Sequence, residues 1–185
     1  MMNFAKIGGD IDVRSVSAQL RLHPELWDEH RWRTDISGGP FSGTSDIWLR
    51  YRAIEELKEA KDFGVEHRAV FYPAWHSLVA VHDIVFSLMR VVKAVELGGI
   101  LITRIPAGGS VKPHHDRGSW HAEFFNRKCY VIIKANEHCV NRFEDEEVVM
   151  KTGEVYLFNN LVTHSVTNGG DSERITLIVC MRVEP

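Results

Sequence analysis

The sequence predicts a mainly β protein, an antiparallel sandwich or barrel of the jelly-roll type, with helices in its N-terminal part. Beyond Gly99, short runs rich in β-branched and aromatic residues follow one another with no helical pattern between them. Before Gly98, apolar residues recur at intervals of three and four, as in a helix that packs against a sheet. We therefore expect the helices to come first and the β-roll second.

The expected strands are separated by turn sequences rich in glycine, proline and asparagine, such as Pro106–Gly109 and Asn168–Asp171. A third turn signal lies at Lys151–Glu154. The runs that read as strands are Ile100–Ile105, Tyr130–Lys134, Val148–Met150, Val155–Phe158, Val162–Val166 and Ile175–Val183. An arrangement of this kind can carry ligand sites in its interior.

The N-terminal part reads as mixed structure. Asp46–Tyr51 is expected to be a short strand, with a helix after it around Ile54 and Leu57. The main amphipathic helix is expected from Trp75 to Gly98-Gly99, where the glycine pair would form a left-handed cap. Its expected role is to brace the sheet.

We expect one domain over 1–185, with a mixed part at 1–98 that carries the supporting helices and a jelly-roll core at 99–185. The 185 residues, 44% of them hydrophobic, suffice for one substantial core. A formal net charge of −3, with both signs scattered, gives no case for general binding to nucleic acids or anionic membranes.

The three cysteines lack CxxC spacing and lie among apolar residues, which favours buried free thiols in a reducing compartment. The N-terminus shows no secretory signal, and charged residues interrupt the longest apolar stretch, Leu78–Leu97. These features predict a soluble cytoplasmic protein.

The candidate chemistry lies in Pro113-His114-His115-Asp116 and in a second histidine fifty residues later, His164. On an extended strand, His114 and Asp116 share a face while His115 points the other way. If His164 joins them from another strand, two imidazoles and one carboxylate bind one face of a metal and leave other positions open. That arrangement suits non-haem Fe(II) and oxygen chemistry.

An HxD sequence alone is common in solvated turns. Here a glycine-rich turn precedes it, and Arg174 begins a strand ten positions after His164. An arginine is suited to a buried carboxylate because its planar fork can bond both oxygens at once.

In these motifs the chain resembles the aspartyl/asparaginyl β-hydroxylase family of Fe(II)/2-oxoglutarate oxygenases. The resemblance covers roughly Ile100 to Arg182. Its motifs are Ile105–His114, Gly153–Asn160, His164–Asn168 and Arg174–Val179, in this order. A fainter likeness extends to Trp27–Arg33 and Asp46–Tyr51.

The resemblance implies a double-stranded β-helix, the jelly-roll (cupin-like) core of these oxygenases. It implies Fe(II) held by His114, Asp116 and His164, with 2-oxoglutarate as cosubstrate and O2 as oxidant. Arg174 matches the arginine that binds 2-oxoglutarate, and Arg127 matches a second family arginine across a gap in the alignment. Thr103 matches a small hydroxyl residue that can bond a cosubstrate carboxylate.

Where the family often has a histidine after the second arginine, this chain has Cys129. We expect His121 to substitute for it in space. Trp120 and His121 are candidates for the substrate pocket, and so is the glycine-rich loop Ser37–Gly43 together with Trp48.

Two other functions stay open. A cupin-type isomerase or an oxygenase without an oxo-acid cosubstrate would share part of the spacing, although Asp116 replaces the expected second histidine and no Glu falls at the fourth ligand position. A non-catalytic β-sandwich that binds a protein or sugar is the other alternative. For the oxygenase, the resemblance suggests hydroxylation of an unactivated carbon in an Asp- or Asn-type residue of a peptide or protein, or in a free amino acid. The oligomeric state is not predicted.

Overall fold

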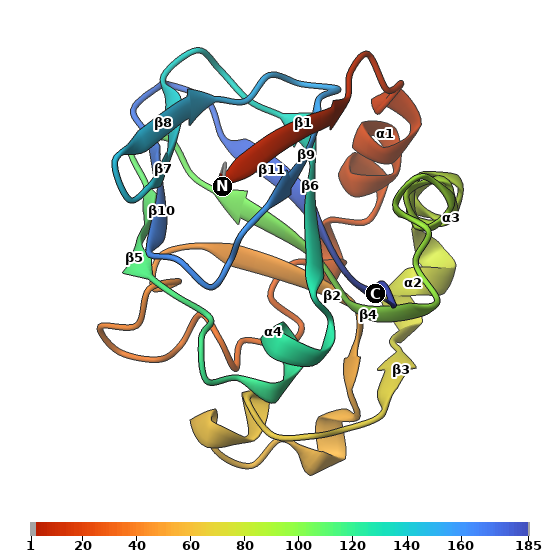
Figure 1. Ribbon diagram of the computed structural model, residues 1–185. Helices are drawn as coiled ribbons and strands as arrows, with labels where there is room; N and C mark the ends of the chain where they lie inside the picture. Colours follow the sequence, from red (N-terminus) through yellow and green to blue (C-terminus); the bar gives the residue numbers. More distant parts are fainter. Residues whose placement is uncertain (1–2, 185) are drawn as a thin grey trace.

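Two antiparallel β-sheets face each other in the computed structural model, which describes residues 3–184 apart from the side chains of residues 60 and 63. The larger sheet has the strand order β1 (Phe4–Gly8), β9 (Val155–Phe158), β6 (Arg127–Lys134), β11 (Arg174–Arg182), β4 (Glu96–Ile105), β2 (Ser45–Arg52), β3 (Ala69–Phe71). The smaller sheet has the order β5 (Ser110–His114), β10 (His164–Asn168), β7 (Cys139–Phe143), β8 (Glu146–Val149). The predicted double-stranded β-helix, or jelly roll, is confirmed (Figure 1).

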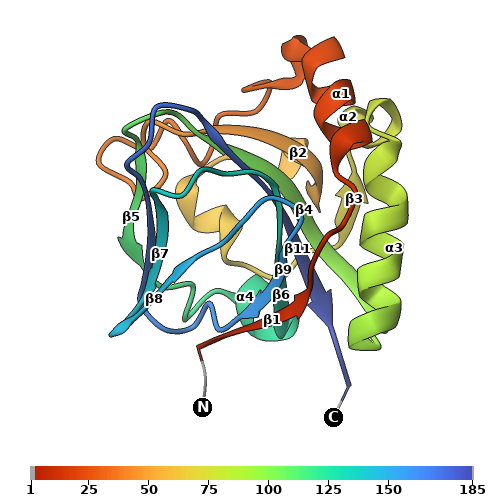
Figure 2. The ribbon, with the colours of Figure 1, turned by 90° about the horizontal axis from the view of Figure 1, so that it is seen from above.

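Helices cover the outer face of the larger sheet, opposite the smaller sheet (Figure 2). They are α1 (Arg14–Leu22), α2 (Pro73–Ser77) and α3 (Ala80–Val92). Leu78, Val81 and Val85 are fully buried against strand residues such as Leu177 and Val179. Burial of each such side chain contributes roughly 1.5–3 kcal/mol, so this layer anchors the larger sheet, against which the smaller sheet packs. None of the described helices is long and apolar enough to cross a membrane.

The space between the two sheets is filled mainly by aromatic side chains. Tyr130, Tyr156 and Phe158 from the larger sheet pack with Phe143 from the smaller one. Alternation along each strand produces this division, because odd and even residues point to opposite faces. On β11, for example, Leu177 faces the helices and Ile178 faces the interior.

The six runs predicted as strands fall on β4, β6, β8, β9, β10 and β11. Two strands of the smaller sheet, β5 and β7, were not predicted. Their sequences, SVKPH and CVNRF, contain few β-forming residues, and pairing with β10 holds both of them. The predicted free, buried state of all three cysteines is confirmed.

The predicted end of the long helix is wrong. Helix α3 ends at Val92, and Lys93 takes the left-handed conformation with φ of 57°. Gly98 and Gly99 lie inside β4 instead. A Cβ at Gly98 would come within 2.6 Å of the Phe125 ring, so glycine is required there by close packing and not by a cap.

The N-terminal part contributes strands as well as helices. The predicted strand Asp46–Tyr51 is confirmed as part of β2, which pairs with β4 inside the larger sheet. The helix expected after it is absent from the described residues there, which form 3₁₀ turns at Ile54–Glu56 and Ala60–Phe63. Strands β1 and β3 also come from the first 98 residues.

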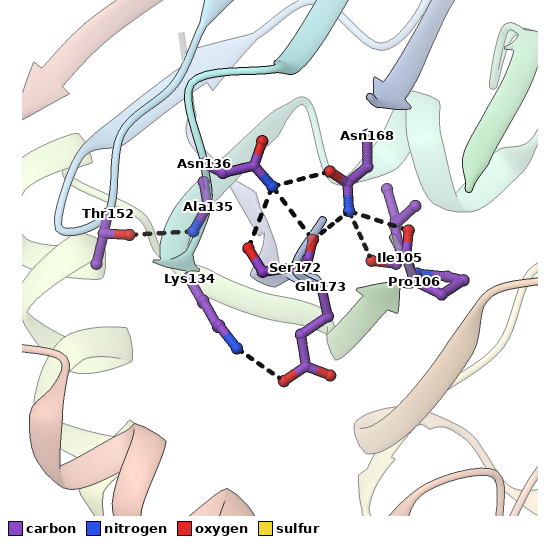
Figure 3. A network of polar contacts seen from close by, with 9 residues as sticks. All are labelled: Ile105, Pro106, Lys134, Ala135, Asn136, Thr152, Asn168, Ser172 and Glu173. Carbon is purple, nitrogen blue, oxygen red and sulfur yellow. Dashed lines mark hydrogen bonds and ion pairs between the residues drawn. The ribbon is translucent and has the colours of Figure 1, made fainter. Parts of the chain in front are cut away.

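Asn168, at the end of β10, ties the two sheets together (Figure 3). Its Nδ2 donates to the carbonyl oxygens of Ile105, Pro106 and Ser172, and its Oδ1 accepts from Asn136 Nδ2 at 3.0 Å. Asn168 is fully buried, and a buried amide with these bonds satisfied fixes the backbone around it. The turn that leads into β11, and so the position of Arg174, is held by this side chain.

Candidate active site

The structure brings His114, Asp116 and His164 together. His114 ends β5, and His164 begins β10 directly opposite it in the antiparallel pair. Asp116 lies two residues beyond the end of β5, where its backbone N–H donates to Asn160 O at 2.9 Å. One possible ligand atom from each of the three lies within 4.8 Å of the others.

Hydrogen bonds fix both histidines with one nitrogen directed at this point. His114 Nδ1 lies 2.8 Å from Lys112 O, and His164 Nδ1 lies 2.9 Å from Val162 O. A carbonyl oxygen only accepts, so Nδ1 carries the proton in each ring and Nε2 keeps its lone pair. Both Nε2 atoms are buried, and neither has a hydrogen-bond partner among the described residues. Such orphaned acceptors are rare and costly, and they are the atoms that a metal ion would bind.

The third group presents one free oxygen. Asp116 Oδ2 accepts from Lys128 Nζ at 2.7 Å and from Asn160 Nδ2 at 2.9 Å. Its Oδ1 lies 3.8 Å from His114 Nε2. Burial alone would raise the pKa of Asp116, but the Lys128 ammonium and the Asn160 amide outweigh burial and hold that pKa well below its usual value. The donor set, two neutral imidazoles and an ionised carboxylate, fits Fe(II).

Burial keeps the two imidazoles neutral. It lowers the pKa of His164 to about 4, with the Lys128 ammonium and His114 adding to the effect. Burial also lowers the pKa of His114. Both rings therefore retain their lone pairs at neutral pH.

Arg174 is buried in the interior between the sheets, with 1% of its surface exposed. Within the described part of the chain its Nε and Nη1 have no hydrogen-bond partner, and its Nη2 lies 4.0 Å from the sulfur of Met150. The guanidinium carbon lies 5.9 Å from the centre of the Tyr130 ring. A buried cation with unsatisfied donors fits an anionic ligand such as the far carboxylate of 2-oxoglutarate.

Thr103 is buried on β4 but is already engaged. Its hydroxyl donates to Asp46 Oδ1 at 2.8 Å and accepts from Arg33 Nη2 at 2.7 Å. Arg33 also forms a two-point ion pair with Asp46. Sequence reasoning did not identify this pair, because the two residues come from a loop and from β2, and no local motif links them.

The structure does not bring Arg127 to the three converging groups. Its side chain is exposed, and its Nη1 donates to Asn126 O. The neighbouring Lys128 faces the interior and binds Asp116. Adjacent residues on a strand point to opposite faces, so Arg127 points out of the barrel while Lys128 points into it. Strand alternation from Tyr130 was the available signal for Lys128.

A cavity of about 480 Å³ opens beside the three groups. Its walls include Phe41 and Pro40 from the glycine-rich loop, Trp48 from β2, and His121. The Phe41 ring centre lies 4.8 Å from that of His114. His121 is buried, and its Nε2 accepts from the Gly99 N–H at 3.0 Å. Trp120 is not among the described residues that line this cavity.

Solved structures of similar fold extend over nearly the whole chain. A prolyl-4-hydroxylase from Pseudomonas putida matches with a TM-score of 0.57 and 12% identity, over 99% of this chain and 94% of that one. A viral collagen prolyl hydroxylase from Paramecium bursaria Chlorella virus-1, solved as a 2-oxoglutarate complex, gives 0.58 and 11%, over 99% and 97%. A 2-oxoglutarate-Fe(II) oxygenase family protein from Burkholderia pseudomallei gives 0.53 and 13%, over 95% and 94%. At these identities the likeness is one of fold.

The family is given by the sequence. No curated protein matches the chain. The family model described as aspartyl/asparaginyl beta-hydroxylase matches residues 73–183, more than half of the chain and all three converging groups. The chain therefore belongs to the aspartyl/asparaginyl β-hydroxylase family and is a 2-oxoglutarate-dependent hydroxylase with Fe(II) as its metal and O2 as its oxidant.

Proposed function

We propose that His114, Asp116 and His164 hold the Fe(II) and that the enzyme hydroxylates an unactivated carbon of an Asp- or Asn-type residue in a peptide or protein, or of a free amino acid. The observation that carries the metal site is the convergence of two orphaned Nε2 atoms and one free carboxylate oxygen. The family description supports the Asp/Asn choice. The prolyl hydroxylases of similar fold support a peptide acceptor.

Each residue near the site has a defined task in this proposal. With its cosubstrate and O2, Fe(II) supplies the oxidising power. Arg174 binds the far carboxylate of 2-oxoglutarate in the interior, and Thr103 on β4 is held by Asp46 from the neighbouring strand β2 and by Arg33 from a loop. Lys128 and Asn160 hold Asp116 so that Oδ1 alone faces the metal. The aromatic interior excludes water from the reacting groups.

We also propose that residues 1–185 form one domain, because strands from both halves of the chain build the larger sheet. The buried free cysteines support a cytoplasmic location. The family match favours this oxygenase over the cupin-type alternative and over a binding module without catalysis.

Anaerobic addition of Fe(II) and then 2-oxoglutarate tests the proposed site. We expect an Fe(II)-dependent charge-transfer absorption band, followed by release of succinate when O2 is admitted. Acceptors are then screened among Asp- and Asn-containing peptides, proline-containing peptides and free amino acids. A protein that neither binds the metal nor converts the oxo acid would contradict the proposal.

Replacing Lys128 by methionine is expected to destabilise the metal-free protein. The change leaves the Asp116 carboxylate in a largely buried place without its cation, which costs about 3 kcal/mol in the free energy of unfolding. A saturating divalent metal should restore part of this loss, because the metal charge replaces the ammonium. Urea unfolding with and without Mn(II) measures both quantities.

Arg127→Met is the matched control for this prediction. Arg127 is the adjacent residue but its side chain is exposed, so unfolding and its response to Mn(II) should stay as in the unmodified protein. A larger effect for Arg127→Met than for Lys128→Met would show that the structure assigns the wrong member of the pair to the site.

A further inference from the structure

The cavity beside the proposed iron site has more cationic than acidic side chains on its walls. Arg33, Lys61, Arg117 and Lys128 line it, and Asp116 is the one carboxylate among its described lining residues. Asp116 is already committed, with Oδ2 bound by Lys128 and Asn160 and Oδ1 directed at the histidines. A ligand in this cavity therefore meets hydrogen-bond donors and positive charge.

Carboxylates close to the cavity are engaged elsewhere. The side chain of Asp46 is fully buried behind Arg33. Asp62 accepts from the backbone N–H groups of Lys58 and Glu59, and Glu123 accepts from that of Gly118. An ammonium group bound in this cavity would find no acidic partner in the described part of the chain, and an unpaired charge away from water is costly.

Arg33 is held rigidly on the cavity wall. Its Nε and Nη2 each bond Asp46 at 2.8 Å, and Nη2 also bonds Thr103. The guanidinium carbon lies 3.9 Å from the centre of the Phe41 ring, which itself packs on the His114 ring. Nη1 is in none of the hydrogen bonds of the described residues, so it remains as a fixed donor for a ligand next to a metal-binding side chain. A fork fixed in this way binds an anionic oxygen with little further loss of entropy.

His121 offers a second donor in the same cavity. Because Nε2 accepts from the Gly99 N–H, the neutral ring carries its proton on Nδ1. A Cβ at Gly99 would lie 3.0 Å from His121 Nε2, so only glycine lets the ring lie this close to β4. The cavity thus combines one charged and one neutral donor on walls that include Phe41 and Trp48.

We propose that the acceptor of this enzyme carries a carboxylate group with no ammonium group beside it, and that Arg33 Nη1 binds this carboxylate. This inference rests on the proposed function, because it takes the cavity to be the acceptor site. The enzyme should therefore bind acids whose amine is acylated or missing more tightly than zwitterionic free amino acids. Arg33 becomes the residue that sets specificity, through a contact with the acceptor and not with the metal.

Paramagnetic broadening of ligand proton signals by Mn(II) in the site tests the proposal without turnover. The probes are L-leucine and L-aspartate, each compared with its N-acetyl derivative, and N-acetyl-L-leucine amide as the neutral counterpart, all with 2-oxoglutarate present. The N-acetyl acids should be broadened at concentrations about tenfold lower than the free amino acids, which bring an unpaired ammonium into the cavity, and than the amide, which lacks the charge-assisted hydrogen bond. A capped peptide with internal aspartate, compared with N-acetyl-L-aspartate, separates a residue within a chain from a small acid, and preferential binding of either one supports the proposal.

Arg33→Lys provides the matched variant. It keeps a cation opposite Asp46 but loses the planar fork, so binding of the N-acetyl acids should weaken about tenfold while affinities for Mn(II) and 2-oxoglutarate are retained. Arg31→Lys, an exposed change in the same segment, should leave all three affinities as they are. Equal or tighter binding of free amino acids, unchanged binding in Arg33→Lys, or broadening of none of the acids would overturn the inference. Failure to bind Mn(II) or 2-oxoglutarate at all would instead overturn the proposed function.

Discussion

Replacing His164 by alanine is expected to lower the affinity for Fe(II) by well over 100-fold and to abolish succinate release. The loss exceeds the tenfold to 100-fold typical of changes around a metal ligand, because His164 is itself one of the three proposed ligands. Anaerobic titration with Fe(II), or with Mn(II) as a stable substitute, measures the affinity. Addition of 2-oxoglutarate then shows whether the charge-transfer band still forms.

This experiment has to distinguish the loss of a metal ligand from the loss of side-chain packing. His164 is 3% exposed, and its ring contacts those of Phe143 and Phe158, so alanine also leaves a hole that costs roughly 2–3 kcal/mol. His164→Gln keeps most of the volume and should lose the metal with a smaller loss of stability. His115→Ala removes an exposed imidazole next to His114 and should retain metal affinity. Full metal affinity in His164→Gln would rule out His164 as a ligand.

Replacing Arg174 by methionine is expected to change stability and binding in opposite directions. In the protein without cosubstrate, Arg174 is a buried cation with two unpartnered nitrogens, and burial lowers its pKa. An apolar side chain of similar length removes this cost, so the free energy of unfolding should rise by about 1–3 kcal/mol. Binding of 2-oxoglutarate should weaken by about 100-fold or more, because two charge-assisted hydrogen bonds are lost.

Thermal unfolding with and without 2-oxoglutarate and Mn(II) measures both effects. Cosubstrate should raise the melting temperature of the unmodified protein. Arg174→Met should have a higher melting temperature without cosubstrate, and cosubstrate should raise it little. Arg182→Met, at the opposite and partly exposed end of β11, should change neither quantity by more than about 0.5 kcal/mol. A destabilised Arg174→Met that still binds 2-oxoglutarate would make Arg174 a structural residue.

The groups that could be anticipated from the sequence are those that short spacing or a family motif defines. The spacing of His114 and Asp116 indicated their closeness, although Asp116 lies beyond the end of β5, and β10 brings His164 opposite His114. Arg33 could not be found in this way, and Lys128 only by extending the strand alternation back from Tyr130. Lys128 depends on where β6 begins after helix α4 (Trp120–Phe124), and Arg33 depends on a partner in another part of the chain.

The difference between local signals and contacts of distant segments also explains the errors in the predicted fold. The β-runs have local signals, so β2, β4, β6, β9 and β11 of the larger sheet could be placed, whereas β1 and β3 were not predicted. Gly98 and Gly99 carry an equally strong local signal for a helix end, but Phe125 and Tyr51 press against them from distant parts of the chain. Strand β5 has little propensity of its own and exists through its pairing with β10. Contacts between distant segments determine the structure at these positions. Such contacts cannot be inferred from the local pattern of a single sequence.

The two histidines of the proposed metal site and the buried arginine belong to different layers of the molecule. His114 and His164 lie on the smaller sheet, whereas Arg174 begins a strand of the larger one. A dicarboxylate bound at both places connects the two sheets. Separation of the sheets therefore requires that the dicarboxylate dissociates. Amide protons on the smaller sheet, even along its outermost strand β8, should therefore exchange with solvent more slowly when the dicarboxylate is bound.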